Sequence, residues 1–213
     1  IGEQYIIPTI GVYDNFDEID FDKLPNQFVM KCTHDSGGII ICKDKNSFDE
    51  NLAKSKMQKY LKRSIYNITR EWPYKNVRAR IIIEKYMQDD NGELMDYKFF
   101  CFNGEVICLK VDFDRFSNHR ANYYDKNFNL LSLDEKRCPS DSSKIIETPK
   151  NYNLMIKIAE DLSKDHPFLR VDLYNINGTI YFGEMTFFPD SGFGTFSPEE
   201  WDYKLGSYIK LPQ

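Results

Sequence analysis

Two alternating apolar and polar stretches, each interrupted by Asn-Gly, most constrain the fold of this 213-residue chain. The first reads MDYKFFCF, then Asn103-Gly104, then EVICLKVDF. The second reads FLRVDLYNI, then Asn177-Gly178, then TIYFGEMTFF. Asn-Gly between such runs is a strong signal for a β-hairpin, because both residues accept the positive φ of a tight turn. The sequence therefore predicts sheets that are mainly antiparallel.

The remaining elements are predicted from apolar patterns. Three further strands are expected over residues 28–32, 38–42 and 79–87. A helix is expected over 47–63, where Ser47 and Glu50 have the spacing of a capping box. A second helix is expected over 151–164, and the polar stretch 115–149 is expected to be irregular. This order of strands and helices indicates an α+β fold.

Composition excludes some classes of protein. The net charge of −5 argues against a general nucleic-acid binder, and no stretch is apolar for long enough to span a membrane. The five cysteines form no C-x-x-C pair, which favours reduced thiols in the cytoplasm. The sequence begins at Ile1 without a methionine, so we expect either a fragment or an ordered portion of a longer protein.

Charge is distributed unevenly along the chain. Residues 54–80 contain nine Lys or Arg residues and a single acid, Glu71. Such a run forms either a solvated helix face or a wall that faces an anion. The sequence leaves both readings open.

The segment FVMKCTHDSGGIIICKDK raises a question about Lys31, a cation in an apolar strand. A buried lysine needs an anionic partner, and the loop Ser36-Gly37-Gly38 that follows could bring backbone N–H groups close to a phosphate. The alternative is an ordinary hairpin whose lysine faces solvent. Glu84, at the end of the run RIIIE, is a similar polar residue: it either faces solvent or accepts a hydrogen bond from a ligand amine.

The second hairpin carries four polar residues with strand spacing. Arg170 and Asp172 share one face of the first strand, and Glu184 and Thr186 share one face of the second. The two faces coincide only if the register allows it, because a slip of one residue reverses every side chain. A two-residue Asn-Gly turn separates the carboxylates, whereas a three-residue loop, 176–178, pairs Arg170 with Glu184. We predict the three-residue loop.

If the faces coincide, the two carboxylates repel each other unless a cation joins them, and their oxygen atoms suit Mg²⁺. The alternative is a solvent-facing salt bridge between Arg170 and the acids.

At this point the chain resembles a known family. The segments KCTHDSGG, REWPYKN, DYKFFCFNGE, LRVDLYNINGTIYFGEMTF and EEWDYKLG are similar to the TupA-like ATP-grasp family, in collinear order over nearly the whole chain. The resemblance implies an ATP-grasp fold, in which two α+β subdomains with mainly antiparallel sheets grip ATP between them. It also implies a lead-in segment over 1–25, a small subdomain over 26–88 and a large subdomain over 89–213. The usual N-terminal subdomain of the family is not in this sequence.

The resemblance implies a role for each motif residue. Lys31 would hold the ATP phosphates under the loop Ser36-Gly37-Gly38, and Arg170 would stabilise charge on the reacting group. The residues expected to contact the rest of the nucleotide are Glu84, Tyr86 and Met87 at the adenine, Asp96 at the ribose and Lys98 near the phosphates. Asp172, Glu184 and Thr186 would hold Mg²⁺, although the fold at large usually has asparagine where Thr186 stands. Arg115, His119 and Arg120 are candidates for contact with the acceptor.

The implied activity is an ATP- and Mg²⁺-dependent carboxylate–amine ligase that proceeds through an acyl phosphate. The family is associated with bacterial surface-polysaccharide and teichuronopeptide synthesis, so the expected partner is a sugar-acid or amino-acid acceptor, including a polysaccharide precursor. Two alternatives remain: a phosphotransferase acting on a glycan hydroxyl, and a nucleotide- or glycan-binding module without turnover.

Overall fold

The computed structural model describes residues 1–90, 92–115, 117–135 and 137–211. The chain divides into a smaller unit, Ile7–Met87, and a larger unit formed by Ile1–Ile6 and Gln88–Gln213. Each unit has its own sheet and its own apolar core. Of the expected lead-in over 1–25, residues 1–6 belong to the larger unit and 7–25 to the smaller unit.

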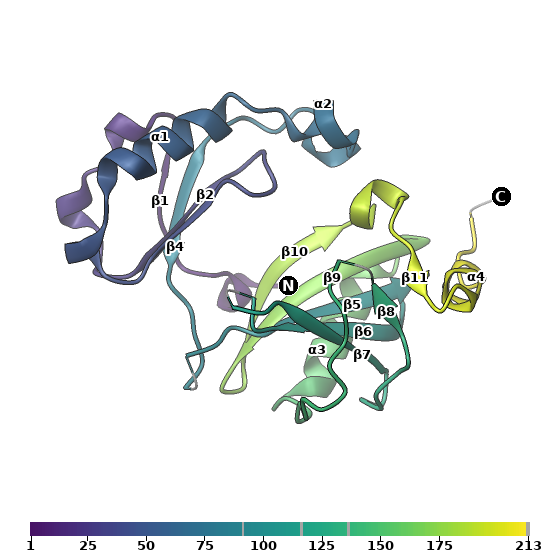
Figure 1. The fold of residues 1–213 in the computed structure, drawn as a ribbon. Coiled ribbons are helices and arrows are strands. Elements are labelled where there is room, and N and C mark those ends of the chain that lie inside the picture. The colour runs from purple at the N-terminus through teal and green to yellow at the C-terminus, as the bar shows by residue number, and fades with distance from the viewer. Residues whose placement is uncertain (91, 116, 136, 212–213) are drawn as a thin grey trace. The chain divides into compact units, whose positions relative to one another are not determined.

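The smaller unit contains a four-stranded sheet in the order β1-β4-β2-β3, with every pair antiparallel. The strands are β1 (Thr9–Tyr13), β2 (Phe28–Cys32), β3 (Ile39–Cys42) and β4 (Ile81–Lys85). Helix α1 (Glu50–Leu61) covers one face of this sheet and α2 (Ile65–Thr69) follows it (Figure 1). Met57 of α1 packs in the same core as Met30 and Ile83. Val29 and Lys31 alternate with those core residues, so they lie on the face away from α1.

Helix α1 starts later than its sequence signal suggested. Its N-cap is Asp49, whose side chain accepts a hydrogen bond from the Leu52 N–H at 2.9 Å. Ser47 lies in a 3₁₀ turn, Lys45–Ser47, that precedes the helix. The prediction of a Ser47–Glu50 capping box was therefore wrong, because an aspartate two residues later caps the helix.

The basic run 54–80 is partly neutralised within its own unit. Lys54 forms an ion pair with Asp17 at 2.5 Å, and Arg78 forms one with Asp14 at 2.6 Å. Lys56 donates to the carbonyl of Ile39 at 2.8 Å. Acidic residues of the N-terminal segment thus pair with part of this run. This arrangement is neither the solvated helix face nor the anion-facing wall that the sequence left open.

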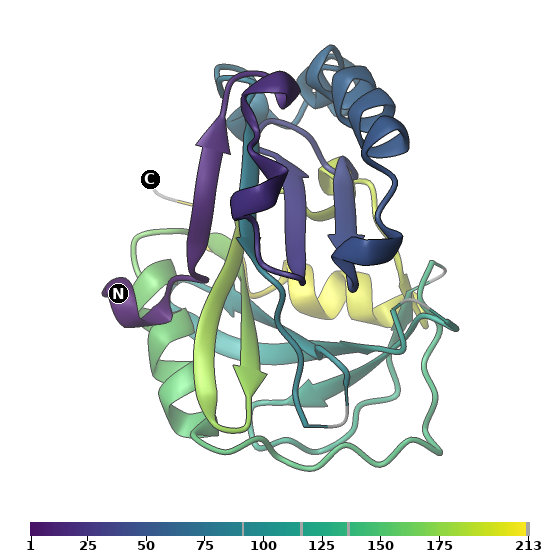
Figure 2. The same ribbon diagram turned by 90° about the vertical axis from the view of Figure 1, so that its left-hand side faces the viewer.

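The larger unit is built on a five-stranded antiparallel sheet in the order β10-β9-β5-β6-β7. The strands are β5 (Asp96–Phe102), β6 (Glu105–Phe113), β7 (Arg120–Asp125), β9 (Phe168–Ile176) and β10 (Thr179–Thr186). Helix α3 (Tyr152–Ser163) covers one face, as Figure 2 shows in green. Strands β8 (Asp134–Glu135) and β11 (Phe196–Ser197) pair with each other, and α4 (Glu200–Gly206) follows. None of the helices in the described residues is long and apolar enough to cross a bilayer.

These sheets confirm the predicted α+β class. Most predicted strands and the 151–164 helix are confirmed within two residues at each end. Strand β7 lies inside the stretch 115–149 that was predicted to be irregular. Its sequence, RANYYD, has no aliphatic alternation, yet Ala121 and Tyr123 are fully buried against β6.

The β9–β10 hairpin differs from the prediction in its turn and in the partner of Arg170, but the four polar residues still share one face. Ile176 pairs with Thr179, so the turn has only two residues, Asn177 and Gly178, with φ of 53° and 97°. The predicted three-residue loop is therefore wrong. A β-bulge between Phe182 and Glu184 shifts the register by one residue, so that Glu184 pairs with Asp172 and Thr186 with Arg170. All four polar residues consequently share one face of the sheet.

Gly183 is the extra residue of this bulge. A Cβ atom at Gly183 would lie 3.0 Å from the backbone carbonyl oxygen of Asp172 and 3.1 Å from the ring of Tyr174. A glycine inside a strand permits such a close approach of two backbones. The position of Glu184 therefore depends on a residue without a side chain.

We expect Gly183→Ala to lower the free energy of unfolding by about 1–3 kcal/mol, because the new methyl group overpacks against the β9 backbone. Gly206→Ala is the matched control: a Cβ there meets no atom within 4 Å, and the helical position favours alanine. Urea denaturation of the two variants measures the difference. Equal stability of Gly183→Ala and wild type would contradict the role given to the close approach.

Candidate functional site

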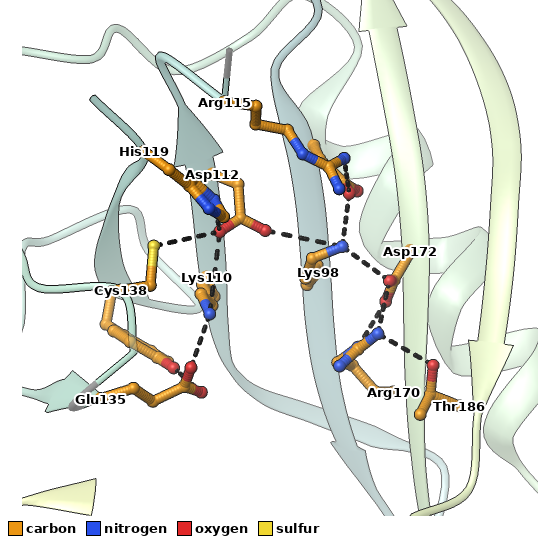
Figure 3. Close-up of polar contacts among 12 residues, drawn as sticks. Lys98, Lys110, Asp112, Arg115, His119, Glu135, Cys138, Arg170, Asp172 and Thr186 are labelled. Carbon is orange, nitrogen blue, oxygen red and sulfur yellow. Dashed lines mark hydrogen bonds and ion pairs between the residues drawn. The ribbon is translucent and has the colours of Figure 1, made fainter. Parts of the chain in front are cut away.

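One face of the five-stranded sheet is apolar under α3, and the opposite face carries a polar row beside a second apolar cluster that includes Phe100 and Tyr123. Strand β5 places Asp96 and Lys98 on the polar face, and their neighbours Tyr97 and Phe99 pack in the core under α3. Because directly paired residues share a face, the β6 residues Lys110 and Asp112 join them there. The β9 residues Arg170 and Asp172 complete the polar row (Figure 3).

Lys98 lies at the centre of this network. Its ammonium pairs with Asp96, with Asp172 at 2.8 Å and with Asp112 at 3.6 Å, so it contacts carboxylates from β5, β9 and β6. Burial alone lowers the pKa of a lysine, but the surrounding carboxylates outweigh it and raise the pKa of Lys98. Lys98 therefore remains charged, and it holds together acids that would otherwise repel one another.

Arg170 binds the other side of Asp172. Its Nε donates to Oδ1 and its Nη2 to Oδ2, both at 2.7 Å, which is the bidentate geometry of a strong arginine–carboxylate pair. The same Nη2 also donates to the Thr186 hydroxyl at 2.9 Å. Burial lowers the pKa of Arg170, but Asp172 and Glu184 more than compensate and raise it.

Asp96 is a buried acid of the network whose pKa is raised. Burial is the largest effect and raises its pKa, against the attraction of Lys98 and of Arg115, whose Nη1 lies 2.9 Å from Oδ2. The other carboxylate oxygen, Oδ1, is buried and accepts no hydrogen bond from the residues that the structure describes. A buried acceptor without a donor is costly, so this oxygen is suited to a donor from a bound molecule.

The far end of the face has a second set of contacts around Asp112. Its Oδ1 lies 3.0 Å from His119 Nε2, and the Cys138 thiol donates to the same oxygen at 3.7 Å. Burial raises the pKa of the Cys138 thiol to about 11, so the sulfur is protonated at neutral pH. Lys110 makes its shortest ion pair with Glu135, at 2.6 Å, and Glu135 also accepts from the Tyr123 hydroxyl.

In the smaller unit, Lys31 and Glu84 form an ion pair with each other. Lys31 Nζ lies 2.6 Å from Glu84 Oε2 on the sheet face away from α1. The lysine side chain is 34% exposed, so it is half-buried rather than enclosed. The loop Ser36-Gly37-Gly38 follows β2, and Gly37 has a φ of 124° that only glycine adopts readily.

Comparison with family models gives one match: the model described as "TupA-like ATPgrasp" matches residues 1–210. The chain belongs to the TupA-like ATP-grasp family. No curated protein matches the sequence.

Solved structures with a similar fold include three ligases. D-alanine–D-alanine ligase from Bacillus anthracis is 20% identical, with a TM-score of 0.49 over 97% of this chain and 61% of that one. The ATP-grasp ligase PsnB, in complex with a minimal precursor, Mg and ADP, is 8% identical, with a TM-score of 0.46 over 96% and 54%. D-cycloserine synthetase DcsG is 15% identical, with a TM-score of 0.43 over 84% and 56%. The chain thus spans less than two thirds of each of these proteins.

The ATP-grasp residues expected from the sequence are brought together in part. Asp96, Lys98, Arg115 and Asp172 form one ion-paired group, and Arg170 with Thr186 adjoins it. Tyr86 and Met87 directly follow β4 in the smaller unit. Arg120 differs: it pairs with Phe113, so it lies on the sheet face opposite Asp112.

Sequence reasoning missed Lys110, Asp112, Glu135 and Cys138. The turn at Asn103-Gly104 does not signal Lys110 or Asp112, because its two-residue register alone would pair Lys98 with Leu109. A bulge between Phe100 and Cys101 shifts that register, and beyond it Lys98 pairs with Lys110 and Asp96 with Asp112. Glu135 and Cys138 come from a short strand and a loop for which the sequence has no periodic signal.

We expect Lys98→Met to lower the free energy of unfolding by about 3–5 kcal/mol at neutral pH, because it leaves buried carboxylates without their common cation. The deficit should shrink on acidification: the pKa of Asp96 is raised in the folded state, so a proton there favours folding and takes the place of the ammonium. Denaturation across acidic and neutral pH measures both effects. Lys157→Met, in an exposed pair with Asp161, is the control and should stay close to wild type.

Proposed function

We propose that this protein is an ATP- and Mg²⁺-dependent carboxylate–amine ligase. The observation that carries the proposal is the β9–β10 register, in which the bulge at Gly183 sets Glu184 opposite Asp172, with Arg170 and Lys98 beside them. Two carboxylates and two cations on one face suit a reaction in which phosphate and carboxylate charges must be held together. Membership of the ATP-grasp family supports this choice.

The donor set fits Mg²⁺. Asp172 and Glu184 offer carboxylate oxygens and Thr186 offers a hydroxyl, and Mg²⁺ prefers oxygen ligands. Thr186 is the weakest of the three because its neutral hydroxyl is a poorer ligand than a carboxylate; like both oxygens of Asp172, it accepts a hydrogen bond from Arg170. When bound, Mg²⁺ would neutralise the charge of the transferring phosphate group.

Nucleotide contacts are assigned to residues of each unit. In the smaller unit, Lys31 and the Ser36-Gly37-Gly38 loop would bind phosphates, and Glu84 with the backbone of Tyr86 and Met87 would bind adenine. In the larger unit, Lys98 is assigned to phosphate and Asp96 to ribose. The unpartnered Asp96 Oδ1 supports the last assignment, since a ribose hydroxyl could donate to it.

In the proposed reaction, an oxygen of the substrate carboxylate attacks the γ-phosphorus of ATP, and ADP leaves. An amine then attacks the acyl carbon, phosphate leaves, and the amine loses a proton. Arg170 would stabilise the developing negative charge through its guanidinium, which Asp172 and Thr186 hold in place. Arg115 lies on the same face and is the candidate for contact with the acceptor carboxylate.

The acceptor is proposed to be a sugar acid or an amino acid of a surface-polysaccharide precursor. The family association is the basis of this proposal, with no residue of the described structure selecting one acceptor over the other. The same site could in principle phosphorylate a glycan hydroxyl, so the assay must distinguish the two reactions.

Incubation with ATP, Mg²⁺ and a panel of sugar acids and amino acids tests the proposal. A ligase releases ADP and, with hydroxylamine present, yields a hydroxamate from the acyl phosphate. A phosphorylated acceptor without hydroxamate would indicate a phosphotransferase. ATP binding without ADP release on any acceptor, measured with the full-length protein, would indicate a binding module.

Glu184→Gln should reduce the rate of ADP release by at least about tenfold, or about 1.4 kcal/mol in the barrier, and should raise the Mg²⁺ concentration required. Glu184 is exposed, so the variant should fold normally. Glu105→Gln, another exposed strand glutamate of the same unit, is the matched control. An unchanged Mg²⁺ dependence in Glu184→Gln would remove Glu184 from the metal site.

Lys31→Ala should weaken ATP binding by about 1.5–3 kcal/mol, the value of a hydrogen bond to a charged group. Its effect on stability should be small, because the Lys31–Glu84 pair is only partly buried. Calorimetry with a non-hydrolysable ATP analogue measures the loss, and Lys59→Ala on the exposed side of α1 serves as control. If Lys31→Ala and wild type bind the analogue alike, Lys31 does not contact the phosphates.

A further inference from the structure

The group Asp112, His119 and Cys138 on the polar face of the larger unit contains no proposed nucleotide or Mg²⁺ ligand, although the family resemblance made His119 a candidate for contact with the acceptor. Within the described residues it is the one group of three His, Cys, Asp or Glu side chains whose ligand atoms all lie within 4.8 Å of one another. The donors are an oxygen, a nitrogen and a sulfur, and they come from β6, from the residue before β7 and from the segment after β8. Figure 3 shows all three side chains converging at one end of the network.

Donor spacing suits a single small ion. Zn²⁺ binds sulfur at about 2.3 Å and nitrogen or oxygen at about 2.0–2.2 Å, so tetrahedral ligands lie roughly 3.3–3.8 Å apart. Asp112 Oδ1 lies 3.0 Å from His119 Nε2 and 3.7 Å from Cys138 Sγ. Only small side-chain movements separate this arrangement from a three-ligand site.

Asp112 is available for such a role because the neighbouring lysines are held by other acids. Lys98 makes its shorter contacts with Asp96 and Asp172, and Lys110 with Glu135. Both lysines lie more than 3.5 Å from Asp112, at 3.6 and 3.7 Å. The carboxylate therefore keeps its negative charge, and its Oδ1 atom lies 3.0 Å from His119 Nε2 and 3.7 Å from both the Cys138 thiol and the Lys110 ammonium.

The environment of Cys138 separates it from other cysteines of the larger unit. Cys101 donates to backbone carbonyls inside the core, and Cys108 packs among aromatic rings. Cys138 is equally buried, yet its sulfur points at a carboxylate. The His119 side chain is 41% exposed, which gives an ion a route to the site and leaves room for a water ligand.

We propose that Asp112, His119 and Cys138 form a binding site for a zinc-like divalent transition-metal ion, with one position open to solvent. Nitrogen and thiolate ligands select such an ion over Mg²⁺, which prefers oxygen atoms alone. On binding, a metal–sulfur bond forms, the S–H bond breaks, and the proton passes to water. This site is distinct from the proposed Mg²⁺ ligands Asp172 and Glu184, and it does not rest on the ligase assignment.

Cobalt and zinc titrations of the purified full chain, with excess Mg²⁺ and without nucleotide, test the proposal. Wild type should bind one equivalent of Co²⁺ with the near-ultraviolet charge-transfer absorption of a cobalt–thiolate bond, and Zn²⁺ should displace it. Cys138→Ser and His119→Ala should each weaken Zn²⁺ binding by at least about 100-fold, because even loss of an outer partner of a ligand costs 10–100-fold. Cys108→Ala and His166→Gln are the matched controls and should bind like wild type.

X-ray absorption of zinc-loaded wild type provides a test without any variant, and should give one sulfur among nitrogen and oxygen neighbours. Absence of the thiolate band, or a Cys138→Ser variant that binds Zn²⁺ as wild type does, would overturn the proposal and leave a hydrogen-bonded group only. ATP-analogue binding, measured on the same samples, reports on the ligase proposal separately. A protein that binds the analogue but not the metal therefore refutes the zinc site alone.

Discussion

The larger unit depends on one buried cation. Lys98 stands in the central strand of a five-stranded sheet and contacts carboxylates from its own strand and from both neighbours. Three acids this close are compatible with a folded protein only if positive charge lies among them, and Arg115 and Arg170 add to it at the edges. The network thus makes a charged surface possible on a sheet whose other face is an apolar core.

The same strand register places both the polar residues and the core residues of the larger unit. Each residue of the network alternates with a core residue, as Lys98 does with Phe99 and Asp172 does with Val171. The packing of α3 on the apolar side therefore fixes the strand register, and the register fixes which charges meet. This coupling explains why the side chains are placed within hydrogen-bonding distance although they come from segments far apart in the sequence.

Much of this architecture follows from the sequence. The two Asn-Gly hairpins and the 151–164 helix carry local signals, and the structure has them where they were expected, except that the loop predicted over 176–178 is a two-residue turn. Other features have no local signal. Asp49 rather than Ser47 caps α1, because both residue types are good N-caps and the path of the chain decides between them. Strand β7 forms because burial in the folded unit outweighs its weak apolar alternation. Cys138 contacts Asp112 from a loop, and a loop has no periodic sequence pattern that would predict this contact.

The bulge at Gly183 has a consequence for how this protein can change over evolutionary time. The bulge adds one residue between Asp172 and Glu184, and this residue keeps the two carboxylates on one side of the sheet. Whether the number of residues between them is odd or even therefore decides which face Glu184 lies on. A gain or loss of two residues in the hairpin preserves the arrangement, whereas a gain or loss of one residue turns the Glu184 side chain to the face that packs in the core. The length of the hairpin should therefore vary in steps of two among functional descendants, while the identity of its surface residues remains free to drift.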